Sequence, residues 1–107
     1  MIFKMTGKHI TITEAMKAYA EEKTSRLPRF YNTVSQVEVI VDGEQTAGKI
    51  GVEIIARGEH SNVFVATEAA EDAYKGVDGA VRKLEEQLRR KKGKERNNKH
   101  VGGHEPA

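Results

Sequence analysis

The stretch AEDAYKGVDGAVRKLEEQLRRKK, residues 70–92, decides the fold of this chain. Its apolar residues recur every three or four positions, which is the spacing of one face of an α-helix. The apolar stripe consists of Ala73, Tyr74, Val77, Ala80, Val81, Leu84 and Leu88. A helix that is apolar on one side needs a surface on which to bury that side. We therefore expect the preceding sequence to supply that surface.

Ahead of this helix, alternating apolar and polar residues indicate four β-strands. The runs cover residues 2–6, 36–41, 50–56 and 62–67. Alternation places one set of side chains on each face of a strand, so one face of the resulting sheet is apolar. We expect a turn-rich loop at residues 42–48 and a hairpin at residues 58–62 to connect the last three strands.

Between the first two strands, the sequence predicts another amphipathic helix. Thr13 is a suitable N-cap, and Glu14 places a carboxylate near the positive end of the helix dipole. The apolar stripe of this helix consists of Met16, Tyr19, Ala20, Leu27 and Phe30. Pro28 disfavours helical geometry at the residue before it, so the helix should kink or end near Leu27.

The resulting order, β-α-β-β-β-α, predicts the α+β fold class. The architecture is a two-layer one, in which a four-stranded, mostly antiparallel sheet carries both helices packed on one face. The residues expected to be buried are Phe3, Tyr19, Val39, Val52, Ile54, Tyr74, Val81 and Leu84.

Length and composition limit the organisation of the chain. Its 107 residues suffice for one domain, which we place at residues 1–92. Residues 93–107 lack an apolar stripe and are predicted to form a flexible basic tail. No apolar run approaches the roughly 20 residues of a membrane span, and the N-terminus lacks the apolar core of a signal peptide. We expect a cytoplasmic protein without a membrane partner.

No combination of side chains in the sequence indicates catalysis. There is no cysteine, and His9 and His60 fall in loops. His100 and His104 could share a metal only if the tail were helical, which Gly102 opposes. Phosphate loops and dinucleotide fingerprints are also missing. The sequence therefore predicts no enzymatic activity, no cofactor, no metal and no small-molecule substrate.

Charge is distributed unevenly along the chain. Residues 1–81 carry 9 Lys and Arg against 12 Asp and Glu, whereas residues 82–107 carry 9 against 4. Carboxylates on the last helix can neutralise only part of this surplus. The expected ion pairs are Glu85 with Arg89, and Glu86 with Arg82 or Arg90. A mildly acidic body with a basic end favours an anionic partner, either a polyanion or a membrane surface, and of these we expect the polyanion.

The two helices should together form a cationic surface. Lys23 falls within the apolar stripe of the first helix. It could bind an anion there, or its stem could simply cover apolar surface while the ammonium stays in water. Side by side, the helices would place Lys23 and Arg26 beside cations of the last helix. Those cations include Lys83 and Arg90. Such a stripe suits phosphate groups.

Structured RNA is the polyanion that this surface favours. Gly76 and Gly79 lie beside the cations of the last helix and would let a bulky backbone come close. Aromatic residues make up only 6% of the chain, and most are assigned to the core. Few rings remain for stacking single-stranded bases, so recognition by shape and phosphate is expected.

Two stretches carry a family resemblance. They are TGKHITITEAMKAYAEEKTSRL, residues 6–27, and the residues 70–92 quoted above. The most specific motifs are the T-G…I-T-E-A opening, D-x-Y followed by V-D, and K-L-x-x-Q-L. With the strand order between them, they closely resemble the family of hibernation promoting factors and ribosome-associated inhibitors, also called sigma-modulation proteins. The resemblance extends from Ile2 to Lys92.

This resemblance implies a non-enzymatic factor that binds the small ribosomal subunit in the channel used by messenger RNA and the A- and P-site tRNAs. Its basic helical surface would face the rRNA and inhibit translation in stationary phase or stress. The rRNA-facing positions carried over are Lys23, Arg26, Arg82, Lys83, Arg89, Arg90, Lys91 and Lys92. The chain is expected to be a short form, without the second domain of long members, and a monomer when free.

Alternative functions remain open from the sequence. A double-stranded RNA-binding module has an α-β-β-β-α order that is contained in this one, but its lysine cluster lies at the start of its last helix. Here the start of that helix is acidic. A protein-interaction domain acting on a transcription factor is a second alternative, and its partner binding should depend weakly on salt.

Overall fold

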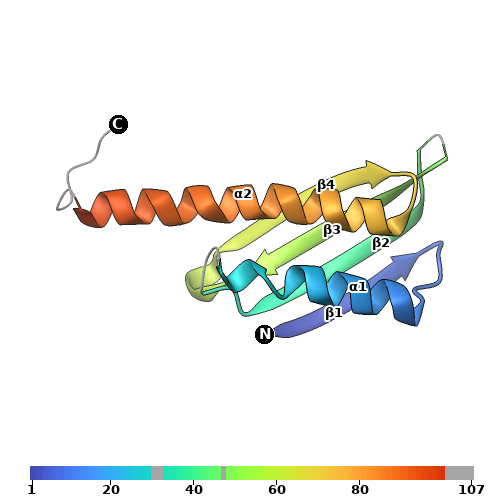
Figure 1. Cartoon of the computed structure of the whole chain (residues 1–107), viewed down its shortest axis with the longest axis horizontal. Coiled ribbons are helices and arrows are strands. Elements are labelled where there is room, and N and C mark those ends of the chain that lie inside the picture. Colours follow the sequence, from blue (N-terminus) through green and yellow to red (C-terminus); the bar gives the residue numbers. More distant parts are fainter. Residues whose placement is uncertain (30–32, 47, 101–107) are drawn as a thin grey trace.

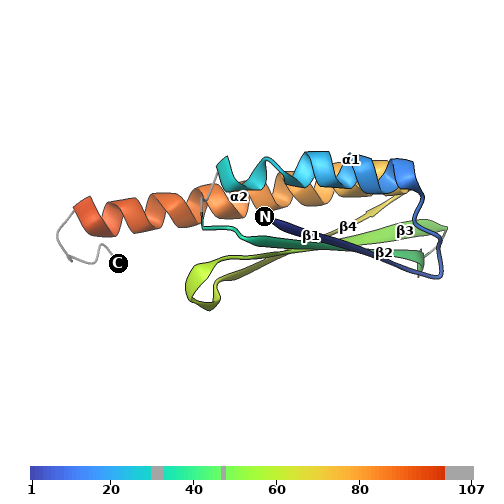
Figure 2. The same ribbon diagram turned by 90° about the horizontal axis from the view of Figure 1, so that it is seen from below.

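In the computed structural model of this chain, a four-stranded sheet carries the α-helices on one face (Figure 1, Figure 2). The structure describes residues 1–29, 33–46 and 48–100. Its elements are β1 (Ile2–Lys8), α1 (Glu14–Thr24), η1 (Leu27–Arg29), β2 (Gln36–Thr46), β3 (Lys49–Arg57), η2 (Glu59–Ser61), β4 (Val63–Ala70) and α2 (Ala73–His100), where η denotes a short 3₁₀ helix. The predicted α+β class and β-α-β-β-β-α order are confirmed.

The strands are arranged in the order β1-β2-β3-β4. β1 runs parallel to β2, and the other two pairs are antiparallel. The parallel pair follows from α1, which crosses over between the two strands. This order leaves β1 and β4 at the two edges of the sheet.

The connection between β2 and β3 is tighter than predicted. Most of residues 42–48 belongs to strand rather than loop, because β2 extends to Thr46. The ladder continues past Asp42 with a register shift and pairs Thr46 with Lys49. Gly48 has φ 77°, a conformation that glycine adopts without strain. Pairing with β3 thus holds polar residues in strand geometry that they would not favour alone.

The core lies between the sheet and the helical layer. The predicted core residues that are buried are Val39, Val52, Ile54, Val81 and Leu84. Phe3 and Tyr19 are half-buried and pack against the edge of the core. The prediction for Tyr74 is wrong, because its side chain is 38% exposed. Its ring lies against that of Tyr19 on α1, with centroids 5.1 Å apart, and not against the sheet.

The local signals for α1 are confirmed. The Thr13 hydroxyl accepts the backbone N–H of Met16 at 3.1 Å, which caps the helix. α1 ends at Thr24, and η1 contains Pro28, so the chain leaves α-helical geometry before the proline. Phe30 lies outside the described residues.

Two glycines bring α2 close to the sheet. A Cβ atom at Gly76 would lie 2.5 Å from Cγ2 of Val52, and one at Gly79 would lie 2.6 Å from Cδ of Glu68. Both glycines are buried and face the sheet. The prediction that they leave room for a bulky ligand is therefore wrong. They allow α2 to lie directly on β3 and β4 instead.

α2 continues beyond the predicted domain boundary at residue 92, as far as His100, and its end projects past the sheet (Figure 1). No apolar stripe is needed here, because an established helix extends readily through a stretch rich in Lys, Arg and Glu. The flexibility of residues 93–107 stays a prediction, and residues 101–107 lie outside the described part. Within that part, none of the helices combines the length and apolar character that crossing a membrane requires.

Candidate nucleic-acid interface

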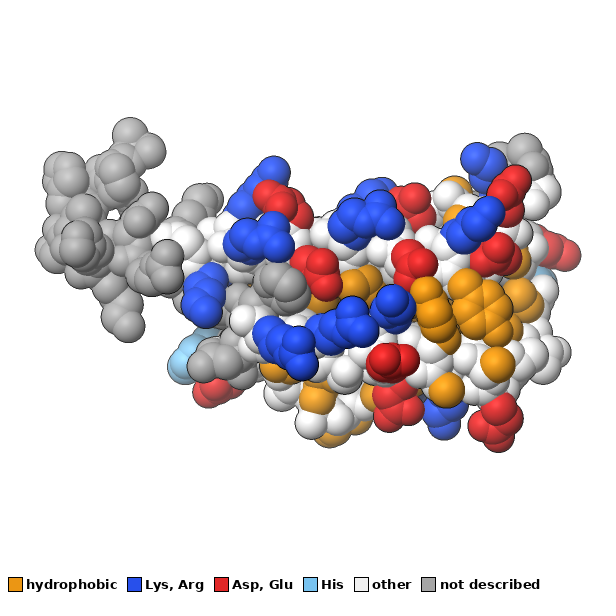
Figure 3. Space-filling view, in the orientation of Figure 1, with side chains coloured by type: hydrophobic (Ala, Val, Ile, Leu, Met, Phe, Trp, Pro, Cys, Tyr) orange, Lys and Arg blue, Asp and Glu red, His pale blue; other side chains and the backbone are white. Residues whose placement is uncertain are grey.

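A groove between α1 and α2, here called the interhelical groove, gathers cations from both sides. Its volume is about 190 Å³, and it is lined by Lys23, Arg26, Asp78, Val81, Arg82 and Glu85. Figure 3 shows Lys and Arg side chains over both helices on this face, with carboxylates between them. The fold thus brings Lys23 and Arg26 to Arg82, although they are far apart in the sequence.

A hydrogen bond between the helices positions Lys23. The Tyr19 hydroxyl of α1 donates to Oδ1 of Asp78 on α2 at 2.6 Å. This bond, together with burial, raises the pKa of Tyr19 to about 12. The Lys23 ammonium lies 5.3 Å from the centroid of the Tyr19 ring, within cation–π range. The charge of Lys23 is therefore held over an aromatic ring at the side of the groove.

The arginines of the groove differ in their partners. Arg26 lies 3.7 Å from a Glu22 carboxylate oxygen, and both side chains are substantially exposed. Arg82 is exposed and makes no ion pair within the described residues. The exposed pair of Arg26 with Glu22 is weak, and Arg82 has no such pair to break among the described residues. Both guanidinium groups can therefore bind an incoming anion.

A second groove runs between α2 and the edge strand β4, and we call it the edge groove. Its volume is about 500 Å³, and it is lined by Glu68, Gly79, Arg82, Lys83, Glu86, Gln87 and Arg90. The sequence predicted that Lys83 and Arg90 would share one surface with Lys23 and Arg26. The structure places Lys83 and Arg90 in the edge groove instead, and Arg82 lines both grooves.

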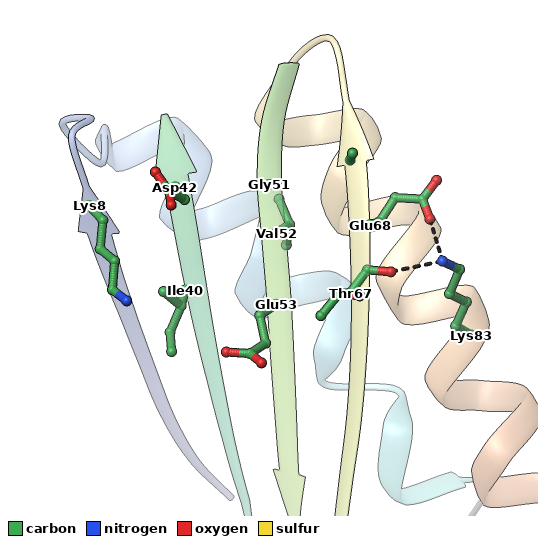
Figure 4. A pocket seen from close by; sticks show the side chains of 10 residues that line it. Lys8, Ile40, Asp42, Gly51, Val52, Glu53, Thr67, Glu68 and Lys83 are labelled. Carbon is green, nitrogen blue, oxygen red and sulfur yellow. Dashed lines mark hydrogen bonds and ion pairs between the residues drawn. The ribbon is translucent and has the colours of Figure 1, made fainter. Parts of the chain in front are cut away.

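Lys83 is held by β4. Its ammonium lies 2.8 Å from a Glu68 carboxylate oxygen and donates to the Thr67 carbonyl at 2.8 Å (Figure 4). The bond from Lys83 lowers the pKa of the Glu68 carboxyl. The structure thus makes Glu68 of β4 a partner of Lys83 on α2.

Further along α2, one carboxylate serves two arginines. Glu86 accepts from Arg89 at 2.9 Å and from Arg90 at 3.1 Å. The predicted pair of Glu86 with Arg90 is confirmed. A single negative charge between two guanidinium groups leaves a net positive charge, which Lys91 and Lys92 extend in the next turn.

Sequence reasoning missed Asp78 as a functional side chain. It lies in the interhelical groove and accepts the Tyr19 hydroxyl, yet these residues are 59 positions apart. No local spacing can reveal such a pair. The V-D motif that includes Asp78 was the one available signal.

Comparison with known proteins identifies the family. A family model described as "Sigma 54 modulation protein / S30EA ribosomal protein" matches residues 3–96. The chain belongs to this family. The match to the sigma 54 modulation family covers α1, most of α2 and the whole sheet apart from Ile2. Membership makes the chain a binding protein rather than an enzyme.

Several relatives share most of their length with this member of the sigma 54 modulation family. A ribosome hibernation promoting factor of Azotobacter vinelandii is 32% identical over 102 residues, which cover 89% of this chain and 86% of the relative. One from Pseudomonas putida is 28% identical over 102 residues, 89% of this chain and 90% of the relative.

Solved structures agree with the fold. A ribosomal subunit interface protein from Coxiella burnetii matches with a TM-score of 0.77 and 27% identity, over 87% of this chain and 99% of that one. The N-terminal domain of Protein Y from Thermus thermophilus matches with a TM-score of 0.71 and 31% identity, over 83% of this chain and 96% of that one. The resemblance inferred from the sequence is thereby confirmed.

Proposed function

We propose that this chain is a ribosome hibernation factor. In this proposal it binds the small ribosomal subunit at the channel for mRNA and the A- and P-site tRNAs, through contacts with rRNA phosphates. Binding inhibits translation in stationary phase or stress, and it takes place in the cytoplasm. The names of the relatives support hibernation, and the observation that carries the binding mode is the interhelical groove.

The groove suits a phosphate group for a physical reason. Lys23, Arg26 and Arg82 approach one small depression from two elements, so a single anion can meet several cations at once. The bond between Tyr19 and Asp78 already fixes the spacing of the helices. Less freedom is therefore lost on binding than if loose surface cations had to be collected.

The end of α2 extends the proposed contact. Arg89, Arg90, Lys91 and Lys92 belong to α2, whose C-terminal part projects beyond the sheet (Figure 2). A projecting cationic helix can follow an RNA backbone that the body of the domain does not reach. Lys83 is expected to contribute less, because a phosphate would have to displace Glu68 and the Thr67 carbonyl.

A salt titration tests the proposal. Purified small subunits are titrated with wild type, Arg26→Ala and Arg82→Ala across a salt series, beside a translation assay. Each phosphate contact releases counterions, so wild-type affinity should fall steeply with salt. Removing one contacting arginine should weaken binding and reduce the slope of log K against log salt by about one unit.

Lys8→Ala is the matched control, because it removes the same charge from the opposite face of the sheet (Figure 4). It should bind and inhibit like wild type. Arginine variants that equal wild type at every salt concentration would contradict the proposed groove contacts. Absence of subunit binding, with salt-insensitive binding to a transcription factor, would favour the protein-interaction alternative.

A further inference from the structure

β4 is an edge strand with the composition of a self-pairing segment. Its sequence, VFVATEAA, contains β-branched and aromatic residues, no proline or glycine, and one charged residue, Glu68. Val63 is 53% exposed and Val65 is 42% exposed. An edge strand of this kind offers unpaired backbone groups to another strand.

The other edge strand is protected by its own side chains. β1 carries Lys4 and Lys8, both exposed, within seven residues. Lysines on an edge strand discourage edge-to-edge pairing, since a second copy would bring like charges together. β4 contains no such lysine, so its protection must come from elsewhere.

Two side chains of α2 donate hydrogen bonds to backbone carbonyls of β4. The Lys83 ammonium donates to the Thr67 carbonyl at 2.8 Å, and the Gln87 side-chain amide donates to the Val65 carbonyl at 2.9 Å. Alternate residues of a strand point their carbonyls to the same side. Two of the acceptors that a neighbouring strand would use are therefore already bonded to α2.

The spacing of the two donors matches the strand. Four residues along a helix advance about 6 Å, and two residues along a strand advance about 6.7 Å. A pair at i and i+4 on α2 can therefore reach successive outward carbonyls of β4. Gly79 allows this approach, because a Cβ there would meet the Glu68 side chain. Glu68 in turn neutralises Lys83 at 2.8 Å.

We propose that the outer edge of β4 is a strand-pairing surface for a second copy of this chain, and that Lys83 and Gln87 hold it closed. A second copy is the fitting partner because two β4 strands paired antiparallel about Ala66 would place Val65 of one copy opposite Thr67 of the other. Val63 would lie opposite Ala69, so each exposed valine gains an uncharged neighbour across the new pair. The lone Glu68 offers little repulsion. Covering the edge keeps the free chain monomeric and leaves its helical face available.

Sedimentation velocity over a range of concentrations tests this proposal on wild type, Lys83→Ala, Gln87→Ala and the double variant. Wild type should remain monomeric. The double variant should self-associate, with an association constant at least about tenfold above that of wild type, the effect expected for one net hydrogen bond. Each single variant should show a smaller increase, and circular dichroism should show a wild-type fold.

Lys75→Ala is the matched control, because Lys75 is an α2 lysine bonded to Glu71 at 3.1 Å. It should remain monomeric. Adding Val65→Lys to the double variant should restore the monomer by placing a charge on the edge strand. If the double variant unfolds, Gln87→Ala alone carries the test. A folded variant that stays monomeric like wild type, or association that Val65→Lys does not reverse, would overturn the proposal.

Discussion

At the scale of single residues, the hydrogen bond between Tyr19 and Asp78 matters most for the interhelical groove. It joins α1 to α2 with an oxygen–oxygen distance of 2.6 Å, which is typical of a bond to a carboxylate. The ring of the same tyrosine lies below the Lys23 ammonium and against Tyr74. One side chain thus couples helix packing to the position of a proposed phosphate contact.

This bond predicts a specific alkaline loss of stability. The pKa of Tyr19 is raised from 10.0 to about 12 in the folded chain. Between these values the unfolded tyrosine loses its proton while the folded one keeps it, so the stability contributed by Tyr19 is complete below about pH 10 and is lost as pH rises toward 12. Urea unfolding measured from neutral to alkaline pH should show this decline.

Tyr19→Phe should lack that component of the pH dependence and should be less stable at neutral pH by about 1 kcal/mol. Identical alkaline profiles for wild type and variant would show that the bond to Asp78 does not control the ionisation of Tyr19.

At the scale of elements, the glycines of α2 have opposite environments. Gly76 faces Val52 across a contact that leaves no room for a Cβ atom, whereas a Cβ at Gly93 would meet nothing within 4 Å. Both lie within one helix, where glycine is unfavourable by itself. The difference between them therefore comes from the sheet and not from helix propensity.

The same substitution should consequently have opposite effects at the two sites. Gly76→Ala gains up to about 1 kcal/mol of helix propensity but forces the core apart at Val52, which typically costs about 1 to 3 kcal/mol, so a net loss of stability is expected. Gly93→Ala gains propensity without a clash and should stabilise the end of the helix. Urea unfolding and helical circular dichroism measure both. Stabilisation by Gly76→Ala would refute the close packing of α2 on β3.

At the scale of the whole molecule, the proposed function is divided between the body and the end of α2. The body holds the interhelical groove, and the helix end carries further cations beyond the sheet. Residues 82–107 carry the surplus of cations, whereas the remainder of the chain is mildly acidic. An extended polyanion can therefore contact the groove and the helix end together.

Two truncations test this division. Removing residues 102–107 should leave binding to the small subunit nearly unchanged, because that segment contains no Lys or Arg. Removing everything from residue 91 onward should weaken binding and flatten its salt dependence. The titration described above measures both. Equal losses from the two truncations would contradict the assignment of phosphate contacts to the helix end.

Local patterns in the sequence were sufficient for the type and order of the elements and for the family, but not for the ends of β2 and α2. Strand alternation, the Thr13 cap and the stop near Pro28 depend on neighbouring residues, so they can be read along the chain. The motifs that carry the family resemblance are also short and contiguous. The Lys and Arg residues of the proposed interface could likewise be named from the sequence, although their arrangement could not.

Only the tertiary structure decided which side chains meet. It assigned Arg82 to the groove with Lys23 and Arg26, gave Lys83 and Gln87 to the edge of β4, and turned Gly76 and Gly79 toward the sheet. Whether a side chain of α2 lies beside α1 or beside β4 depends on the rotation of α2 about its axis. The packing of that helix on the sheet sets this rotation. A periodic pattern defines a helix face only broadly, whereas hydrogen bonds of about 2.8 Å depend on where each side chain lies.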